Sequence, residues 1–288
     1  GNVIIDDIPF EMVEVPAGEY YGHNYCANEE YMDMDYTFEI MKYAVTNAQY
    51  AQFLIEGVEN GYLIISDLND GALVYYTGDQ FTDPTWSYLG YLVSSSCEGN
   101  PGSGITWNGN TFIVDEGKGN HPVAGVNWIG AWAFANYYGL RLPSMQELIK
   151  TGRGPMEWGL PFEDPYSDPS VPDWFGSYVL TPERSNYKGS GDPWECGTTP
   201  VDFYNGQNYE GFQTIDSPSY YGAYINGNVS EWTSNFTCEV WCNQTCNSAR
   251  IINKHSFTET GDCAIQSTAA GHGNTPNIGF RCARTTGN

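Results

Sequence analysis

The sequence predicts an α+β fold with few helices, short strands and much irregular loop. Helical signals, from apolar spacing or from capping residues, are confined to three segments before Arg153. An Asn108-Gly109 pair between alternating apolar residues is a strong hairpin signal. From Arg153 to Arg284, glycine, proline, asparagine and serine recur every few residues, without sustained helical periodicity. Because no repeat or linker divides the 288 residues, we expect a single domain spanning residues 1–288.

The first expected elements follow from local patterns. The run from Phe10 to Pro16 alternates apolar and polar residues, which predicts a strand that opens the domain. Thr46 is a suitable cap for a helix from Asn47 to about Ile55. Glycine, asparagine and aspartate punctuate the next stretch, at about 56–120, which we interpret as a β-rich insertion.

Two further helices are expected before the irregular half of the chain. The second follows Asn127, carries apolar side chains on a face that should be buried, and ends at Gly139. The third begins at a capping box in which Ser144 precedes Glu147 by three residues. Gly152 is expected to stop this helix, because glycine is a common helix terminator.

The charge and composition exclude several classes of function. The chain has 35 acidic and 11 basic residues and a net charge of -24, so it would repel nucleic acid and anionic membrane surfaces. No apolar run approaches the ~20 residues needed to cross a bilayer, so no membrane insertion is expected. The even count of 8 cysteines favours an oxidising compartment. We expect an extracellular, cell-surface or virion-surface protein whose targeting segment is not in this chain.

Six segments occur in the order typical of one enzyme family. They are Met12-Val-Glu-Val-Pro-Ala-Gly18, Tyr43-Ala-Val-Thr-Asn-Ala-Gln-Tyr50, His121-Pro-Val-Ala-Gly-Val-Asn-Trp128, Arg141-Leu-Pro-Ser144, Gly227-Asn-Val-Ser-Glu-Trp232 and Asn277-Ile-Gly-Phe-Arg281. With these landmark segments the chain resembles the formylglycine-generating-enzyme, or sulfatase-modifying factor, family. The resemblance implies a C-type-lectin-like fold, with two or three helices on small, twisted antiparallel sheets and much irregular backbone.

The catalytic centre of that family does not carry over. Its enzymes use two cysteines to hold copper and oxidise a substrate cysteine, and the resemblance places Cys263 on the second and Thr258 on the first. A threonine hydroxyl is a hard, neutral ligand and cannot complete a two-thiolate copper(I) site. The arginines around the family's site are replaced by Ala264, Gln266 and Gly271. We therefore expect no copper and no enzyme activity.

The histidines and cysteines raise two other possibilities, an iron site and a zinc site. An iron oxidase of the superfamily would need clustered histidines, but the four in this chain have no pair at helical ligand spacing: His23, His121, His255 and His272. His121 is expected to be a packing residue. Cys238, Cys242 and Cys246 could hold zinc with Cys263 or His255, although disulfides are the more common use of such cysteines in an exported protein.

Calcium fits the oxygen-rich loops better, because hard cations take carboxylate, amide and carbonyl oxygens. By resemblance, a first site uses the carbonyls of Gly227 and Val229 and the carboxylate of Glu231. Its fourth ligand position falls at Tyr224, so the site is weakened unless Asn226 substitutes.

A second calcium site is implied by the same resemblance. It uses the side chains of Asn186 and Asp192 and the carbonyls of Tyr187 and Trp194. The alternative is that these residues form turns and bind no metal, since asparagine and aspartate are also common turn formers.

The segment at about 250–278 keeps the family's skeleton but changes its other positions. Ser256, Phe257, Ala269-Ala270 and Asn274-Thr-Pro276 are retained. This pattern resembles the variable proteins of diversity-generating retroelements, in which a mutagenised segment of this fold ends in Gly-Phe-Arg. Randomised asparagine codons there give a restricted set of residues to which most of the changes belong. The predicted ligand-binding residues are His255, Phe257, Thr258, Thr260, Asp262, Ala264, Ile265, Ser267, Gly271 and His272.

The sequence thus predicts a calcium-stabilised, non-catalytic surface protein that binds a variable protein or glycan ligand. Loops on a rigid scaffold can change side chains without disturbing the core, as antibody loops do. Two alternatives stay open. The chain could be a copper-dependent formylglycine-generating oxidase, or a drifted structural surface protein with no variable role.

Overall fold

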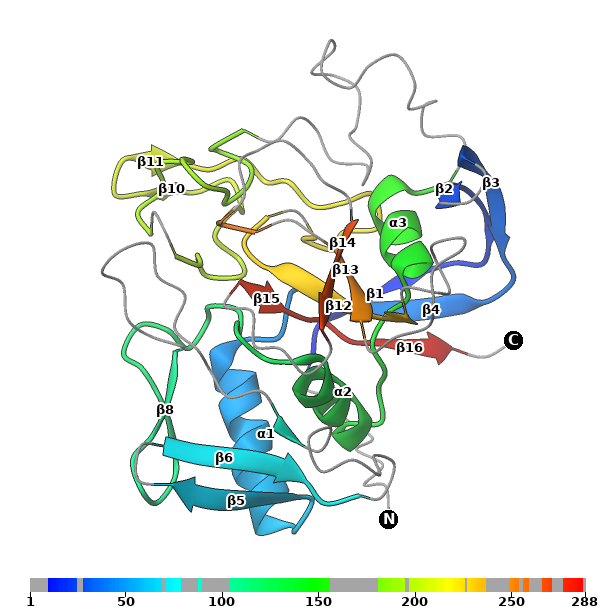
Figure 1. Cartoon of the computed structure of the whole chain (residues 1–288). Helices are drawn as coiled ribbons and strands as arrows, with labels where there is room; N and C mark the ends of the chain where they lie inside the picture. Colours follow the sequence, from blue (N-terminus) through cyan, green and yellow to red (C-terminus); the bar gives the residue numbers. More distant parts are fainter. Residues whose placement is uncertain are drawn as a thin grey trace.

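The computed structural model describes residues 10–24, 28–68, 71–78, 88–89, 104–155, 181–194, 197–225, 227–236, 249–253, 256–258, 266–270 and 277–286. Within these residues the chain forms three α-helices and six small sheets of two to four strands (Figure 1). The predicted α+β fold class is confirmed. None of the helices in the described part is long and apolar enough to cross a membrane.

Helix α1 spans Asn47–Glu59 and begins where the sequence predicted. The Thr46 side chain accepts a hydrogen bond from the Gln49 backbone N–H, and the Gln49 side chain accepts one from the Thr46 N–H. The helix continues one turn beyond Ile55, because Gly57 is buried in close contact with the side chain of Leu63. The periodicity of apolar residues did not predict this last turn, because it contains the polar residues Glu56 and Glu59.

Helices α2 and α3 also begin at their predicted caps. Helix α2 spans Trp128–Tyr137, and the Asn127 side chain accepts from the Gly130 N–H at 2.8 Å. Helix α3 spans Met145–Arg153 behind the expected capping box. The predicted stop at Gly152 is wrong by two residues, because the helix ends at Gly154, whose φ of 76° lies in the left-handed region that favours glycine.

Two sheets contain the first four strands of the chain. The strand expected at Phe10–Pro16 is present as β1. In the first sheet, β4 pairs with both β1 and β16, so the two ends of the described chain lie in one sheet. The strands of the two sheets are β1 (Met12–Val15), β4 (Thr37–Met41) and β16 (Ala283–Thr286), then the hairpin of β2 (Gly18–Asn24) and β3 (Asn28–Met34).

The described residues of the stretch predicted to be β-rich contain five strands. Two of them, β8 and β9, form the hairpin expected around Asn108-Gly109, and the Asn108 side chain accepts backbone hydrogen bonds from Asn110 and Thr111. Strand β5 packs against α1 and pairs with β6, and both strands cross the lower part of α1 in the view of Figure 1. The five are β5 (Leu63–Leu68), β6 (Gly71–Tyr76), β7 (Tyr88–Leu89), β8 (Ile105–Trp107) and β9 (Phe112–Val114).

The C-terminal part forms a four-stranded sheet in the order β14-β13-β12-β15. Strand β15 runs parallel to β12, whereas the other neighbours are antiparallel. The strands are β12 (Ser230–Phe236), β13 (Ala249–Asn253), β14 (Gln266–Ala270) and β15 (Ile278–Gly279), and a separate small hairpin holds β10 (Asn208–Tyr209) and β11 (Phe212–Gln213).

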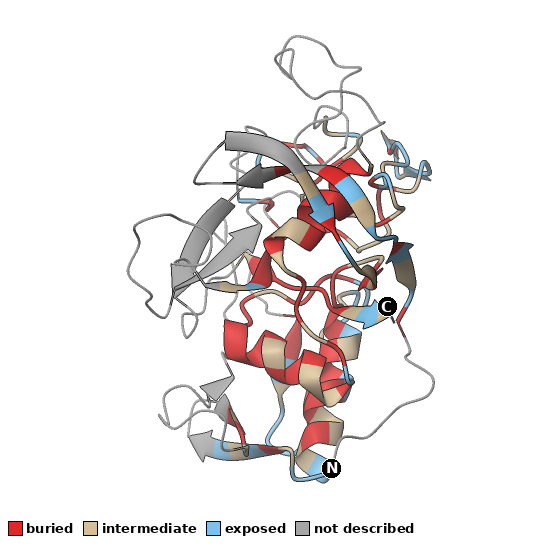
Figure 2. Cartoon of the chain, turned by 90° about the vertical axis from the view of Figure 1, so that its right-hand side faces the viewer, coloured by how far each residue is buried: buried red, intermediate tan, exposed pale blue. Residues whose placement is uncertain are grey.

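The core is aromatic and joins the helices to the last strands. The ring of Phe134 in α2 lies 5.4 Å from that of Phe53 in α1 and 5.3 Å from that of Phe280, which follows β15. Figure 2 shows the buried residues concentrated in the helices and in the centre of the molecule. Because Phe280 is fully buried, the residues just after the predicted binding segment are part of the rigid scaffold.

Candidate functional site

A buried ion pair supports the sheet from which the predicted binding segment emerges. Arg281 donates to both carboxylate oxygens of Glu231 in β12, from Nε and Nη2, each at 2.8 Å. The two side chains are 1% and 3% exposed. Arg281 Nη1 also donates to the carbonyls of Met41 and Lys42, and Nη2 donates to that of Tyr224. The pair therefore ties the C-terminal sheet to β4.

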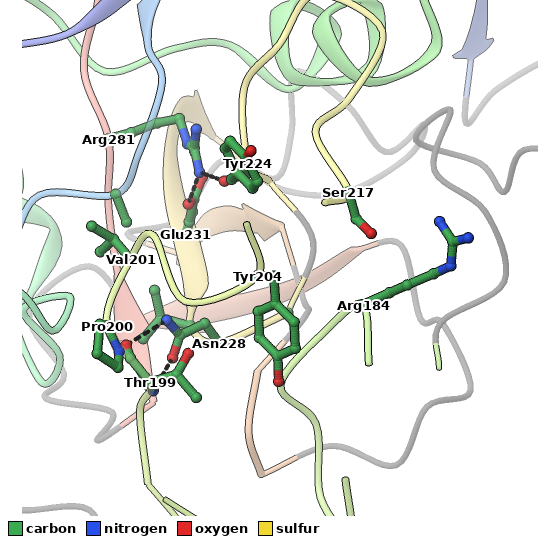
Figure 3. A pocket seen from close by; sticks show the side chains of 13 residues that line it. Arg184, Thr199, Pro200, Val201, Tyr204, Ser217, Tyr224, Asn228, Glu231 and Arg281 are labelled. Atoms are coloured by element: carbon green, nitrogen blue, oxygen red, sulfur yellow. Dashed lines mark hydrogen bonds and ion pairs between the residues drawn. The ribbon is translucent and has the colours of Figure 1, made fainter. Parts of the chain in front are cut away.

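The described members of the first predicted calcium set line one cavity. Gly227, Val229 and Glu231 border a space of about 30 Å³, together with Arg281 and Thr199 (Figure 3). This volume can hold one or two water molecules or a bare ion. The carboxylate, however, is already neutralised by Arg281, and a guanidinium beside a divalent cation is unfavourable. The first set therefore fits calcium poorly, and its remaining member, Asn226, lies outside the described residues.

The second predicted calcium set lies in a single loop. Asn186 and Asp192 are buried, and the carboxylate oxygens of Asp192 accept hydrogen bonds from Ser190 Oγ and the Trp194 N–H. Both donors are neutral. The carbonyl of Tyr187 accepts from Ser190 N–H and that of Trp194 from the Gly197 N–H. Carboxylate, amide and carbonyl oxygens are the ligands that calcium prefers, so this set is compatible with calcium.

Asn228 connects this loop to the predicted binding segment. Its φ of 68° is unusual for a residue other than glycine. Its side chain forms a two-bond pair with the backbone of Thr199, accepting from N–H at 3.0 Å and donating to the carbonyl at 2.9 Å (Figure 3). The Asn228 N–H donates to the Asn186 carbonyl, and its own carbonyl accepts from the Phe257 N–H at 3.0 Å. The backbone of the binding segment is thus fixed to the core at Phe257.

Thr258, which the resemblance aligns with the family's first copper-binding cysteine, belongs to a small hydrogen-bonded cluster. Asn277 Nδ2 donates to Ser256 Oγ and to Thr258 Oγ1, each at 2.8 Å, and the two hydroxyl oxygens lie 2.9 Å apart. Ser256 is buried and Thr258 is exposed. We call Ser256, Thr258 and Asn277 the clasp, because they join positions 19 residues apart in the sequence.

The other predicted binding residues are placed as follows. Phe257 is 1% exposed and points into the interior, so its backbone and ring belong to the scaffold. Ser267 lies in β14, opposite Ile252 of β13. The remaining predicted positions lie outside the described residues: His255, Thr260, Asp262, Ala264, Ile265, Gly271 and His272.

The described residues contain no group of three or more histidine, cysteine, aspartate or glutamate side chains that could hold a metal ion. Cys282 is a free, buried thiol, and burial raises its pKa well above the usual value. Cys263 and the cysteines at 238, 242 and 246 lie outside the described residues.

His121 is buried, as expected of a packing residue, with its Nδ1 3.0 Å from Thr198 Oγ1. Its Nε2 atom has no hydrogen-bond partner among the described residues. Burial, reinforced by the positive charge of Lys118, lowers the pKa of His121 to about 4. The ring is therefore neutral at physiological pH.

Three residues of this site were not assigned a role from the sequence: Asn228, Asn277 and Arg281. All three lie in the landmark segments, which was the available signal. Their roles depend on partners 19 to 240 residues away, which local patterns do not reveal.

Comparison with known proteins gives three findings. A model of the sulfatase-modifying factor enzyme 1-like domain matches residues 8–286. No curated protein matches the sequence. Among solved structures, the chain is similar to PvdO from Pseudomonas aeruginosa, with 18% identity, a TM-score of 0.56, and coverage of 99% of this chain and 98% of that one. It is also similar to CarF, with 20% identity, a TM-score of 0.56, and coverage of 97% and 99%. At these identities the two likenesses describe the fold alone.

Proposed function

Because the chain belongs to the sulfatase-modifying factor enzyme 1-like family, we propose that it is a non-catalytic, ligand-binding member of that family. Its membership and its C-type-lectin-like fold, both expected from the landmark segments, are confirmed. The proposal concerns what this scaffold does without the family's chemistry.

The main support for the proposal is the position of the Thr258 hydroxyl and its hydrogen bonds. Its hydroxyl stands where the resemblance places the first copper-binding cysteine, and it is hydrogen-bonded to Asn277 and Ser256. These partners are hard oxygen and nitrogen groups, whereas copper(I) prefers thiolates. A single remaining cysteine, Cys263, would leave the metal without its second sulfur.

The binding surface in this proposal is the segment at about 250–278. Phe257 and Phe280 are buried on either side of the predicted variable positions 258–272, so the core contacts of these two rings do not depend on the side chains at those positions. We propose that the protein is the variable protein of a diversity-generating retroelement, displayed on a cell or virion surface. Its partner would be a protein or glycan, recognised by aromatic and small polar side chains.

Copper analysis and an activity assay test the absence of catalysis. After incubation of the full chain with copper(I) and desalting, we expect less than stoichiometric copper by mass spectrometry and no conversion of a cysteine-containing sulfatase peptide. The variant Thr258→Cys provides a matched comparison, because it restores the second sulfur. Stoichiometric copper together with peptide turnover by the unmodified chain would favour the oxidase and contradict the proposal.

Calcium is proposed to stabilise the loop that contains Asn186 and Asp192. At a free calcium concentration tenfold above Kd, binding adds about 1.4 kcal/mol to the free energy of unfolding. For a chain of 288 residues we expect a rise in Tm of about 2–3 °C over the chelator-treated protein. Asp192→Asn should abolish this rise, whereas Glu116→Gln, which removes an exposed charge, should retain it. An equal Tm with calcium and with chelator would count against the site.

A further inference from the structure

The clasp lies inside the predicted binding segment and joins Ser256 and Thr258, which follow β13, to Asn277, which precedes β15. Ser256 is 1% exposed and its neighbour Phe257 is bonded to Asn228 through the backbone. At the other end, the Asn277 carbonyl accepts from the N–H of Ser230 in β12. Each end is thus fixed to the core, and the two bonds from Asn277 Nδ2 join the ends to each other.

We infer that Thr258 is a positioning residue that, with Ser256 and Asn277, holds together the two ends of the ligand-binding segment, rather than a variable ligand contact. The inference rests on the proposed function, and it changes the role of one predicted ligand-binding residue, Thr258. Although the Thr258 side chain is exposed, its hydroxyl is already bonded within the clasp. A residue without a hydroxyl at 258 would leave an Asn277 donor and the buried Ser256 hydroxyl with fewer partners.

This arrangement has a physical advantage for a segment whose side chains differ between copies. Closing a loop costs conformational entropy. Contacts that already hold two parts of the segment together reduce the entropy that the segment loses when a ligand binds. If the closing contacts were themselves variable, many copies would lose the geometry of the whole segment. Positions between the ends can change freely only when the ends stay constant.

The test is a protease-resistance screen of single-site libraries in the full 288-residue chain displayed on yeast. Codon 258 and codons 260, 262, 264, 265, 271 and 272 are each randomised separately. At position 258 we expect serine to resist cleavage as well as threonine, and valine and alanine to be cleaved about three- to tenfold faster, because cleavage tracks the population of the opened segment. Thr111→Val, a change of the same type in the β8–β9 hairpin, should be cleaved at the wild-type rate.

The outcomes distinguish the positioning role of the clasp from the proposal that the segment is variable. If either Thr258→Val or Thr258→Ala resists protease as well as Thr258→Ser, the clasp does not position the segment. Alanine is included because it removes the hydroxyl without adding bulk, so a packing defect of valine alone cannot imitate the result. If position 258 behaves as expected but the other six positions tolerate no substitution, the positioning role of the clasp is supported and the proposal of a variable segment fails.

Discussion

Replacing Glu231 with glutamine is expected to lower the free energy of unfolding by about 3–5 kcal/mol, the largest effect of any single change considered. Glutamine preserves the shape of the side chain but removes the charge opposite Arg281. The guanidinium is 1% exposed and cannot move into water, so its charge would be left buried beside a neutral amide. Urea denaturation at pH 7 followed by fluorescence gives the measurement.

The ion pair between Arg284 and Glu39 provides the matched control. It joins the same residue types across β16 and β4, but its side chains are 42% and 22% exposed. Because solvent screens such pairs, Glu39→Gln should cost about 0.2–1 kcal/mol. The double change Glu231→Gln with Arg281→Met should recover part of the loss, since it removes the unpaired charge. Equal costs for Glu231→Gln and Glu39→Gln would show that burial of the first pair is not important.

Acid is expected to destabilise the protein through His121. Its pKa is about 4 in the folded chain and about 6.5 in an unfolded one. Between these values the unfolded state binds more protons, so the contribution of His121 is complete above pH 6.5 and is lost as the pH falls to 4. The loss amounts to about 3 kcal/mol.

Many carboxylates also titrate in this pH range. The effect of His121 is therefore measured as the difference in unfolding free energy between the wild type and a variant without the histidine. Denaturation of the wild type and of His121→Gln should be compared at pH 7, 6, 5 and 4. Glutamine does not titrate, so the stability advantage of the wild type should shrink by about 3 kcal/mol between pH 7 and 4. Parallel pH profiles for the two proteins would mean that His121 does not exchange a proton on unfolding.

Local signals in the sequence predicted the starts of the helices well. Thr46, Asn127 and Ser144 cap their helices because a side-chain oxygen and a backbone N–H two or three residues later meet without help from the rest of the fold. The ends were predicted less well. Gly154 rather than Gly152 terminates α3, and both are glycines, so only the folded backbone distinguishes them.

The candidate site was predicted only in part, for a related reason. The landmark segments located Glu231 and Arg281 but did not reveal that the two side chains pair, because 50 residues separate them. That pairing changes the interpretation of Glu231 from a calcium ligand to the partner of a buried cation. In the same way, Thr258 was read from the sequence as a variable position, and its bond to Asn277 emerged only from the way β15 returns beside β12.

The pairing of β16 with β4 has a consequence for how the protein is made. Strand β4 is synthesised about 245 residues before its partner, and the buried side chains of Phe280 and Arg281 also come from the last residues described. A ribosome adding about 5–20 residues per second would expose an incomplete core for many seconds. The sheet and the core can therefore be completed only after these last described residues have been synthesised.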